Sequence, residues 1–293
     1  MTASRRGGSL RRVALAGALT ASACGGEDLT PSPVRCQSLV GCATSCDELG
    51  PRTDRVLDPA RVDDGLGAVR VGLFVARSYP TGGGDELDVS RVESLLRGVV
   101  RETEETLAPC GLGVRVEHAE VTHVPASSLS LVANREGAWG GMAPEGEDAD
   151  AFNHAQNEPL TEPVRRLMAH ARRHLSPGAI AIVVVDELSY YAAGERRAAS
   201  GVSFPPVIFH RAEDIPLRNG VLIGGAYGGC GRAPVAVGPR VVAHELGHML
   251  LDTGTHDADP DNLMSATAGA RVRPAQCARM ADGPARLLAP APP

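Results

Sequence analysis

Two histidines separated by three residues, with a glutamate directly after the first, are the residues of this chain best suited to chemistry. They are His244, Glu245 and His248 in the segment HELGH. On an α-helix, positions i and i+4 lie one turn apart on the same face, so both imidazoles can reach one metal ion. This spacing is typical of a zinc site in which the glutamate holds the metal-bound water without being a ligand itself.

The residues around this segment predict the helix that the two histidines require. Apolar residues recur at helical spacing at Val242, Leu246, Met249 and Leu250. At 3.6 residues per turn this stripe points away from the histidines, so we expect it to pack into a core. Gly238-Pro239 is a start signal, since proline fits the first helical position, and Gly254 is a stop signal.

A catalytic zinc ion has three protein ligands in most enzymes, so we expect a third donor downstream of the helix. His256 is the strongest candidate, because a neutral imidazole suits zinc and a nearby glycine lets the chain turn back. Asp252 and Asp257 are the alternatives. The alternation of Asp257, Asp259 and Asp261 could bind calcium, but the segment lacks the glycine and distal glutamate of an EF-hand loop, which favours a solvated acidic turn.

The stretch from His244 to Met264 resembles the metzincin zinc proteases. Their motif, HExxHxxGxxH, is followed by a turn that carries a methionine beneath the metal. Both histidines and the glutamate of HELGH match this motif directly. Asn262-Leu263-Met264 is similar to the methionine turn, which implies that Met264 forms an apolar floor under the zinc ligands.

The match to the metzincin motif departs at two positions. The family glycine falls at Leu251, and the family's third histidine falls at Gly254. His256 therefore fits as the third ligand only if the turn is two residues longer. The resemblance implies a catalytic core of this superfamily without pointing to a particular protease.

Residues 1–23 predict a bacterial-type secretory signal peptide. Four arginines precede a short apolar stretch, and Ala21-Ser22-Ala23 supplies small residues for cleavage. The apolar stretch is too short to span a membrane as a helix. Cys24 follows directly and resembles the lipobox cysteine of bacterial lipoproteins, with ordinary cleavage and a free Cys24 as the alternative. We therefore expect a lipid-anchored protein of the bacterial cell envelope, facing the periplasm or the cell surface, and otherwise a secreted one.

The cysteine count agrees with this assignment. With Cys24 given to the lipid, six cysteines remain, and an even number in an exported protein predicts disulfides. They are Cys36, Cys42, Cys46, Cys110, Cys230 and Cys277. The sequence does not choose among the pairings. As an alternative, a cysteine of the 36–46 segment could ligate the zinc and hold the enzyme latent.

The composition limits the classes of function. The chain has 293 residues and a formal net charge of −6, which becomes −10 once the four arginines of the signal peptide are removed. An acidic protein of this kind is a poor candidate for nucleic-acid binding, which needs a basic surface. The length suits one sizeable core. Nothing in the sequence indicates an oligomeric state.

The order of predicted elements defines the organisation. Residues 24–66 are rich in Gly, Pro, Ser, Asp and Arg and are interpreted as a tether or pro-segment; residues 67–293 are the expected catalytic domain. Periodicity predicts strands at 68–76, 112–121, 179–185, 206–210 and 220–224, helices at 89–107 and 160–175 and from 274, and a polar loop at 134–158. This order suits an α/β (α+β) fold with one sheet packed on helices. The resemblance implies a metzincin-like core, with a twisted mixed sheet, an active-site helix and a C-terminal helix.

Other side chains carry weaker signals. His170 and His174 have i, i+4 spacing on a predicted helix and form another candidate metal pair, but no glutamate is adjacent, and the helix dipole favours histidine near a C-terminus anyway. His118 and His123 lie on or near a predicted strand, where a surface or hydrogen-bonded histidine is the default. Tyr190-Tyr191 is expected in a loop, where it could help to stabilise a transition state.

These observations together predict an exported zinc-dependent endopeptidase that acts on a peptide or protein. His244, His248 and His256 would hold Zn²⁺, which lowers the pKa of a bound water towards about 7 and polarises the scissile carbonyl. Glu245 would take a proton from that water and deliver one to the leaving amine. Two alternatives stay open: a zinc-binding surface lipoprotein without peptidase activity, and a zinc amidase that acts on the cell wall.

Overall fold

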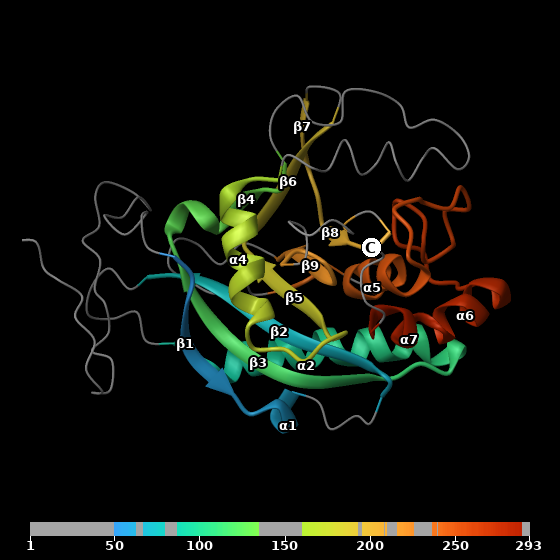
Figure 1. The fold of residues 1–293 in the computed structure, drawn as a ribbon, viewed down its shortest axis with the longest axis horizontal. Coiled ribbons are helices and arrows are strands. Elements are labelled where there is room, and N and C mark those ends of the chain that lie inside the picture. Colours follow the sequence, from blue (N-terminus) through green and yellow to red (C-terminus); the bar gives the residue numbers. More distant parts are fainter. Residues whose placement is uncertain are drawn as a thin grey trace, which may run out of the picture. The chain divides into compact units, whose positions relative to one another are not determined.

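The fold is described by a computed structural model of the chain, shown in Figure 1. The structure describes residues 50–62, 67–79, 87–134, 160–192, 195–207, 209, 216–225, 236–238 and 240–288. The predicted signal peptide, Cys24 and most of the segment 24–66 lie outside these residues. The predicted polar loop after residue 134 and Cys230 lie outside them as well.

A six-stranded mixed sheet, packed with helices, confirms the predicted α/β (α+β) class. Its strands follow one another in the order β1 (Arg52–Leu57), β3 (Val114–Val124), β2 (Val69–Ser78), β5 (Ile180–Val185), β9 (Gly220–Gly224) and β8 (Gly201–Phe204). The four inner strands run parallel to one another. β1 and β8 pair antiparallel at the two edges.

The central strand β5 is buried on both faces. Its residues alternate between two core clusters, with Ile180, Ile182 and Val184 in one and Ala181, Val183 and Val185 in the other. Helices cover the two faces of the sheet, so a strand in its middle has no polar side. The wholly apolar run at 179–185 is therefore confirmed as a buried strand.

The helices belong to two different core clusters. α2 (Val89–Leu107) and α5 (Val241–Leu251) pack in one cluster, and α4 (Glu162–Arg172) packs in the other. Figure 1 shows α4 in front of the sheet and α2 behind it. α6 (Pro274–Ala281) and α7 (Gly283–Leu288) pack against α5. The helices predicted at 89–107 and from Pro274 are confirmed, and the helix predicted at 160–175 is present in shorter form.

A second, three-stranded sheet consists of β4 (Ser130–Val132), β6 (Glu187–Ala192) and β7 (Glu195–Ala198). Tyr190 and Tyr191 lie in β6 and pair with Arg197 and Arg196 of β7. The prediction that these tyrosines lie in a loop is therefore wrong. Tyrosine is well suited to a pleated, half-buried surface, and the neighbouring strand supplies the pairing that the local sequence does not reveal.

The sheet begins before Gly67, where the predicted catalytic domain starts. β1 and the short helix α1 (Pro59–Val62) lie within the segment interpreted as a tether or pro-segment. β1 pairs with β3 from Arg52 opposite His123 to Leu57 opposite Ala119. Only its last residue is buried. An edge strand with this exposure has no apolar alternation, so hydrophobic periodicity does not detect it.

The strand predicted at 206–210 is also wrong for the residues that are described there. Pro206 and Val207 form a turn, and the strand is β8, which ends at Phe204. Two consecutive prolines follow Phe204, and proline cannot donate a hydrogen bond to a sheet ladder. These prolines end β8 before the apolar residues of segment 206–210, on which the prediction of a strand rested.

One of the expected disulfides lies within the described residues. Cys110, in the short 3₁₀ helix that follows α2, is bonded to Cys277 of α6. This confirms the general prediction of disulfides for one pair. The bond joins the end of α2 to the C-terminal helices across a sequence separation of 167 residues.

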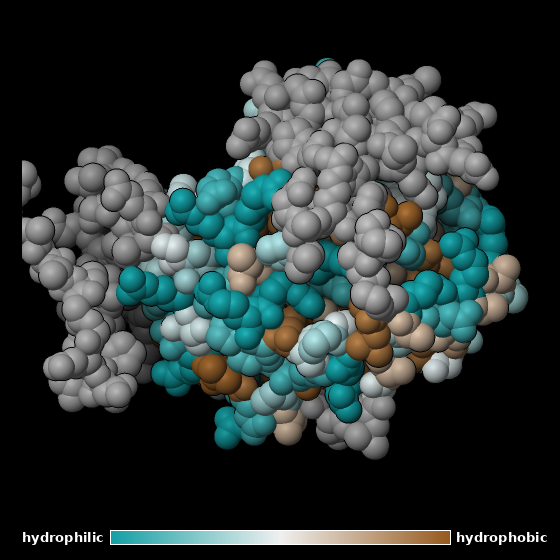
Figure 2. Space-filling view, viewed as in Figure 1, coloured by the Kyte–Doolittle hydropathy of each residue, from teal (hydrophilic) through white to brown (hydrophobic). Residues whose placement is uncertain are grey.

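The surface of the described chain is predominantly hydrophilic on the face seen in Figure 2, with apolar residues in small separate areas. The large apolar side chains exposed in the described part are Val56 and Leu288. Among the described residues, no helix combines the length and the apolar character needed to cross a membrane.

Candidate metal centre and active site

The HELGH segment lies on α5, as predicted. The apolar stripe of this helix is buried, and the two histidines and Glu245 are buried as well, at 6%, 4% and 5% exposure. The helix packs on β8 and β9, at one edge of the large sheet. α5 thus places its three polar side chains beside the edge strand β8.

The end of α5 differs from the prediction. Gly254 is not the stop residue, because the helix ends at Leu251 and Asp252 takes the left-handed conformation with φ 51°. Aspartate is one of the few residues that tolerate this conformation. The Asp252 carboxylate accepts a hydrogen bond from the backbone N–H of Val207 at 2.7 Å, which holds the turn in place. The chain then leads to His256.

Three histidines meet beyond this turn. His244, His248 and His256 each offer a ring nitrogen, and these atoms lie within 4.8 Å of one another, so the group could hold a metal ion. The Nε2 atoms of His244 and His248 are 3.1 Å apart. His256 is exposed, so the group opens to solvent on that side. The longer turn that the match to HExxHxxGxxH required is therefore present.

Backbone carbonyls orient two of the three imidazoles. Nδ1 of His244 donates to the carbonyl of Leu263 at 2.6 Å, and Nδ1 of His248 donates to the carbonyl of Thr253 at 2.9 Å. These bonds place the hydrogens on Nδ1 and leave both Nε2 lone pairs free, with the two Nε2 atoms 3.1 Å apart. Such outer hydrogen bonds fix the tautomer and the ring orientation of histidines that bind metals.

The electrostatic environment keeps the histidines neutral. Desolvation, together with the neighbouring His244 and His256, lowers the pKa of His248 to about 3. Desolvation also lowers the pKa of His244 and of His256. A histidine must be neutral to ligate a metal, so this environment favours binding at neutral pH.

The structure does not bring the alternative ligands into the group. Asp252 is engaged at the helix end, as described above. Asp257 accepts a hydrogen bond from Arg273 at 2.9 Å and one from the backbone N–H of Asp259 at 2.9 Å. Asp261 pairs with Arg271. Arginines and backbone amides therefore satisfy the acidic residues of this turn.

The predicted methionine turn lies against α5. Met264 is buried, and its backbone N–H donates to the side chain of Asn262 at 2.8 Å. The Asn262 side chain in turn donates to Gln276 of α6 at 2.9 Å. A Cβ added at Gly247 would lie 2.4 Å from the sulfur of Met264, so a larger residue here would force the Met264 side chain to shift. The sequence alone gave no role to Gly247 of HELGH, and this packing against Met264 supplies one.

Glu245 faces the edge strand β8. Desolvation raises the pKa of its carboxyl to about 7, and a hydrogen bond with Ser203 opposes the shift. A Cβ added at Gly201 would lie 2.4 Å from Oε1 of Glu245. Sequence reasoning missed both contributions, since Gly201 and Ser203 lie more than forty positions away and have no motif spacing to HELGH.

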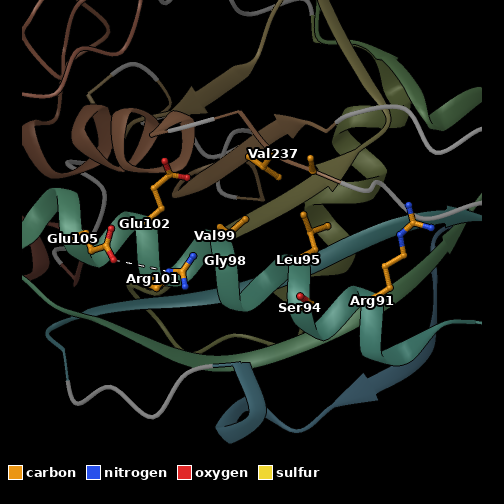
Figure 3. Close-up of a pocket in the computed structure, with 10 residues that line it drawn as sticks. Arg91, Ser94, Leu95, Gly98, Val99, Arg101, Glu102, Glu105 and Val237 are labelled. Carbon is orange, nitrogen blue, oxygen red and sulfur yellow. Dashed lines mark ion pairs between the residues drawn. The ribbon is translucent and has the colours of Figure 1, made fainter.

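A cavity of about 520 Å³ lies away from these histidines, along α2. Figure 3 shows its lining, with Arg91, Leu95, Arg101 and Glu102 of α2 on one side and Val237 on the other. The lining contains neither histidine nor cysteine. None of the groups of histidine, cysteine and acidic side chains that could hold a metal ion among the described residues lies in this lining.

Comparison of the sequence with models of known protein families gives no match, and comparison with curated proteins gives no significant match.

Proposed function

We propose that the protein is an exported zinc-dependent endopeptidase that hydrolyses peptide bonds, with Glu245 as the general base. The observation that carries the proposal is the convergence of ring nitrogens from His244, His248 and His256 beside a buried glutamate of the same helix. The packing of Met264 against Gly247 supports the resemblance to the metzincins. Export and attachment of a lipid at Cys24 belong to the proposal and rest on the sequence.

Zinc is the proposed metal because the donor set consists of neutral imidazoles. The Nε2 lone pairs of His244 and His248 lie on atoms 3.1 Å apart, so they repel one another unless a cation binds to both. A zinc ion bound here supplies a Lewis acid that polarises a carbonyl and lowers the pKa of water. The side left open by His256 gives a substrate access to the ion.

Glu245 is proposed to move the proton. It follows His244 on α5, so its side chain lies beside the ligand nitrogens without sharing their direction. Ser203 occupies one position on the carboxyl group, and the remaining lone pairs can accept a proton from the attacking water. The same carboxyl group then delivers a proton to the leaving amine, so that no net proton is gained or lost by the enzyme.

The position of β8 favours an extended peptide as the substrate. β8 is the last strand of the sheet and pairs only with β9 among the described residues. An extended peptide can add to such an edge through backbone hydrogen bonds. Because Gly201 of β8 contacts the carboxyl of Glu245, a peptide bound there would pass the proposed base.

The test is digestion of a diverse peptide library by the purified full chain with zinc, beside its Glu245→Gln variant. We expect cleavage by the first and a loss of about 10²–10⁴-fold in the second, because Gln cannot accept the proton. Glu195→Gln, at an exposed position of β7, is the matched control and should cleave normally.

Three results would contradict the proposal. Full activity in a Glu245→Gln variant that still holds zinc would remove Glu245 from its role. Absence of cleavage by the wild-type chain with zinc bound would favour a zinc-binding lipoprotein. Cleavage of peptidoglycan fragments but of no peptide in the library would favour a cell-wall amidase.

A further inference from the structure

We propose that His118, Glu120 and His174 form a second site for a divalent transition-metal ion such as Zn²⁺, separate from the site on α5. Each of the three residues offers one ligand atom, and these atoms lie within 4.8 Å of one another. The sequence showed His174 as half of a histidine pair without a neighbouring glutamate. The fold supplies that glutamate from β3.

The distances suit a metal ion after a small adjustment. Nε2 of His118 is 2.9 Å from Oε2 of Glu120, and Nε2 of His174 is 4.0 Å from the same oxygen. Tetrahedral zinc with bonds of about 2.0–2.2 Å keeps its ligand atoms roughly 3.3 Å apart. To reach this spacing, Nε2 of His174 must approach Oε2, and Nε2 of His118 must move slightly away from it.

Neighbouring residues hold Glu120 in the orientation that the site requires. Its carboxylate is fully buried, and Oε1 accepts hydrogen bonds from Nε2 of His170 at 2.7 Å and from Thr122 at 2.7 Å. Arg173 can only donate, so Nδ1 of His170 accepts from it at 3.0 Å, and Nε2 of His170 carries the hydrogen. With Oε1 anchored in this way, Oε2 accepts a hydrogen bond from Thr53 at 3.1 Å and also lies next to His118 and His174.

The charges also fit a cation. Glu120 accepts hydrogen bonds from His118, His170, Thr122 and Thr53, so its buried carboxyl group is surrounded by donors, which favour a negative charge. In the metal-free arrangement, the N–H of His118 points to Oε2. A bound cation takes the place of that hydrogen, and His118 changes to the tautomer with its hydrogen on Nδ1.

The surroundings separate this cluster from the α5 site and give it access to solvent. The side chain of His174 is 32% exposed, whereas Glu120 is 0% exposed, so an ion can enter past His174. The rings of His118 and His174 stack at 5.0 Å, and Phe74 packs on His118 at 5.4 Å. α4 belongs to the core on the opposite face of the sheet from α5. A bound ion would join the turn that follows α4 to β3.

The test counts zinc ions per chain by elemental mass spectrometry on the full-length protein after removal of excess metal. We expect two ions in the wild-type chain and one in His174→Ala. His248→Ala should also hold one ion, and the double variant none. His174→Ala should retain peptidase activity, because His174 lies on the opposite face from the proposed catalytic residues. His123→Ala is the matched control, a partly buried histidine of the same strand as His118, and should keep both ions.

A second variant separates loss of a ligand from loss of structure. Cysteine also ligates zinc, so His174→Cys should recover the ion that His174→Ala loses, and its cobalt form should show a thiolate-to-metal absorption band. A wild-type count in His174→Ala would overturn the proposal. So would a single ion in the wild-type chain that His248→Ala abolishes, or a failure of His174→Cys to recover the second ion.

Discussion

Two clusters of histidine and glutamate lie on opposite faces of the sheet, and their glutamates have opposite environments. Burial raises the pKa of Glu245 to about 7, and a hydrogen bond with Ser203 offsets only part of that effect. Glu120 is also buried, but it accepts hydrogen bonds from two histidines, Thr122 and Thr53, and the bonds from the histidines and Thr122 lower its pKa. The number of donors around a buried carboxyl thus decides its charge. A carboxyl that titrates near neutral pH suits proton transfer, and a permanently ionised one suits a cation.

The histidines of the two clusters also differ in the groups to which they donate hydrogen bonds. In the α5 cluster, two imidazoles donate to backbone carbonyls, and their free nitrogens face each other. In the other cluster, His118 and His170 donate directly to a carboxylate. The first arrangement has lone pairs but no anion within the ligand set, whereas the second has an anion already paired with donors. We therefore expect removal of the metal to destabilise the α5 cluster more than it destabilises the cluster of His118, Glu120 and His174.

The largest effect in this comparison is expected for His256, the proposed third ligand of the α5 site. His256→Ala should weaken zinc binding at this site by more than about 100-fold, because it removes a ligand, whereas changes in outer residues cost 10–100-fold. Asp257→Ala is the matched control and should have a small effect, since Asp257 pairs with Arg273. Competition titration with a chromogenic chelator measures both. The reverse ranking would show that Asp257 is the ligand.

Loss of the Cys110–Cys277 disulfide should have an intermediate effect on stability, and it should loosen only the surroundings of the α5 cluster. Cys277 follows Gln276, which holds Asn262 of the methionine turn. Replacing Cys110 and Cys277 together by Ser should lower the free energy of unfolding by about 2–5 kcal/mol. Hydrogen exchange should increase in α6 and around Met264 more than in α4. Equal loosening of α4 would break the distinction between the two faces.

A third buried carboxyl group, that of Asp186, gives an effect on stability that vanishes at low pH. Asp186 is 2% exposed, its side chain has no hydrogen-bond partner among the described residues, and burial raises its pKa to about 7. Its folded pKa exceeds the unfolded one, so stability is full below about pH 3.8 and is lost as pH rises towards 7.

Asp186→Asn removes this titration. Relative to the wild-type chain, it should gain about 4 kcal/mol at pH 8, because a shift of roughly three pKa units is worth about 1.4 kcal/mol per unit, and the gain should disappear near pH 4. Chemical denaturation at the two pH values measures it. A gain that does not change with pH would mean that Asp186 is ionised in the folded chain, and that donor number does not decide the charge of buried carboxyls here.

The part of the site that the sequence could predict is the part encoded within one helix. HELGH places two histidines and a glutamate on one turn, and the apolar stripe of α5 orients them. α2 was predictable for the same reason, since its buried residues recur at helical spacing. β5 was predictable because a strand covered on both faces is apolar throughout.

The rest depends on contacts between distant residues. Glu120 lies fifty positions before His170, and no local spacing joins them. Ser203 and Gly201 reach Glu245 only through the packing of β8 on α5. β1 was hidden because its residues are polar and exposed. The end of α5 was misplaced because Asp252, rather than a glycine, adopts the left-handed conformation.

The most direct test is anomalous diffraction at the zinc absorption edge, from crystals of the full chain grown with zinc. We predict one peak bonded to Nε2 of His244, His248 and the ring of His256, and a second peak between His118, Glu120 and His174. A map without a peak at the first position would contradict the central claim that α5 carries a catalytic metal. A first peak bonded to Asp257 in place of His256 would contradict the assigned ligand set.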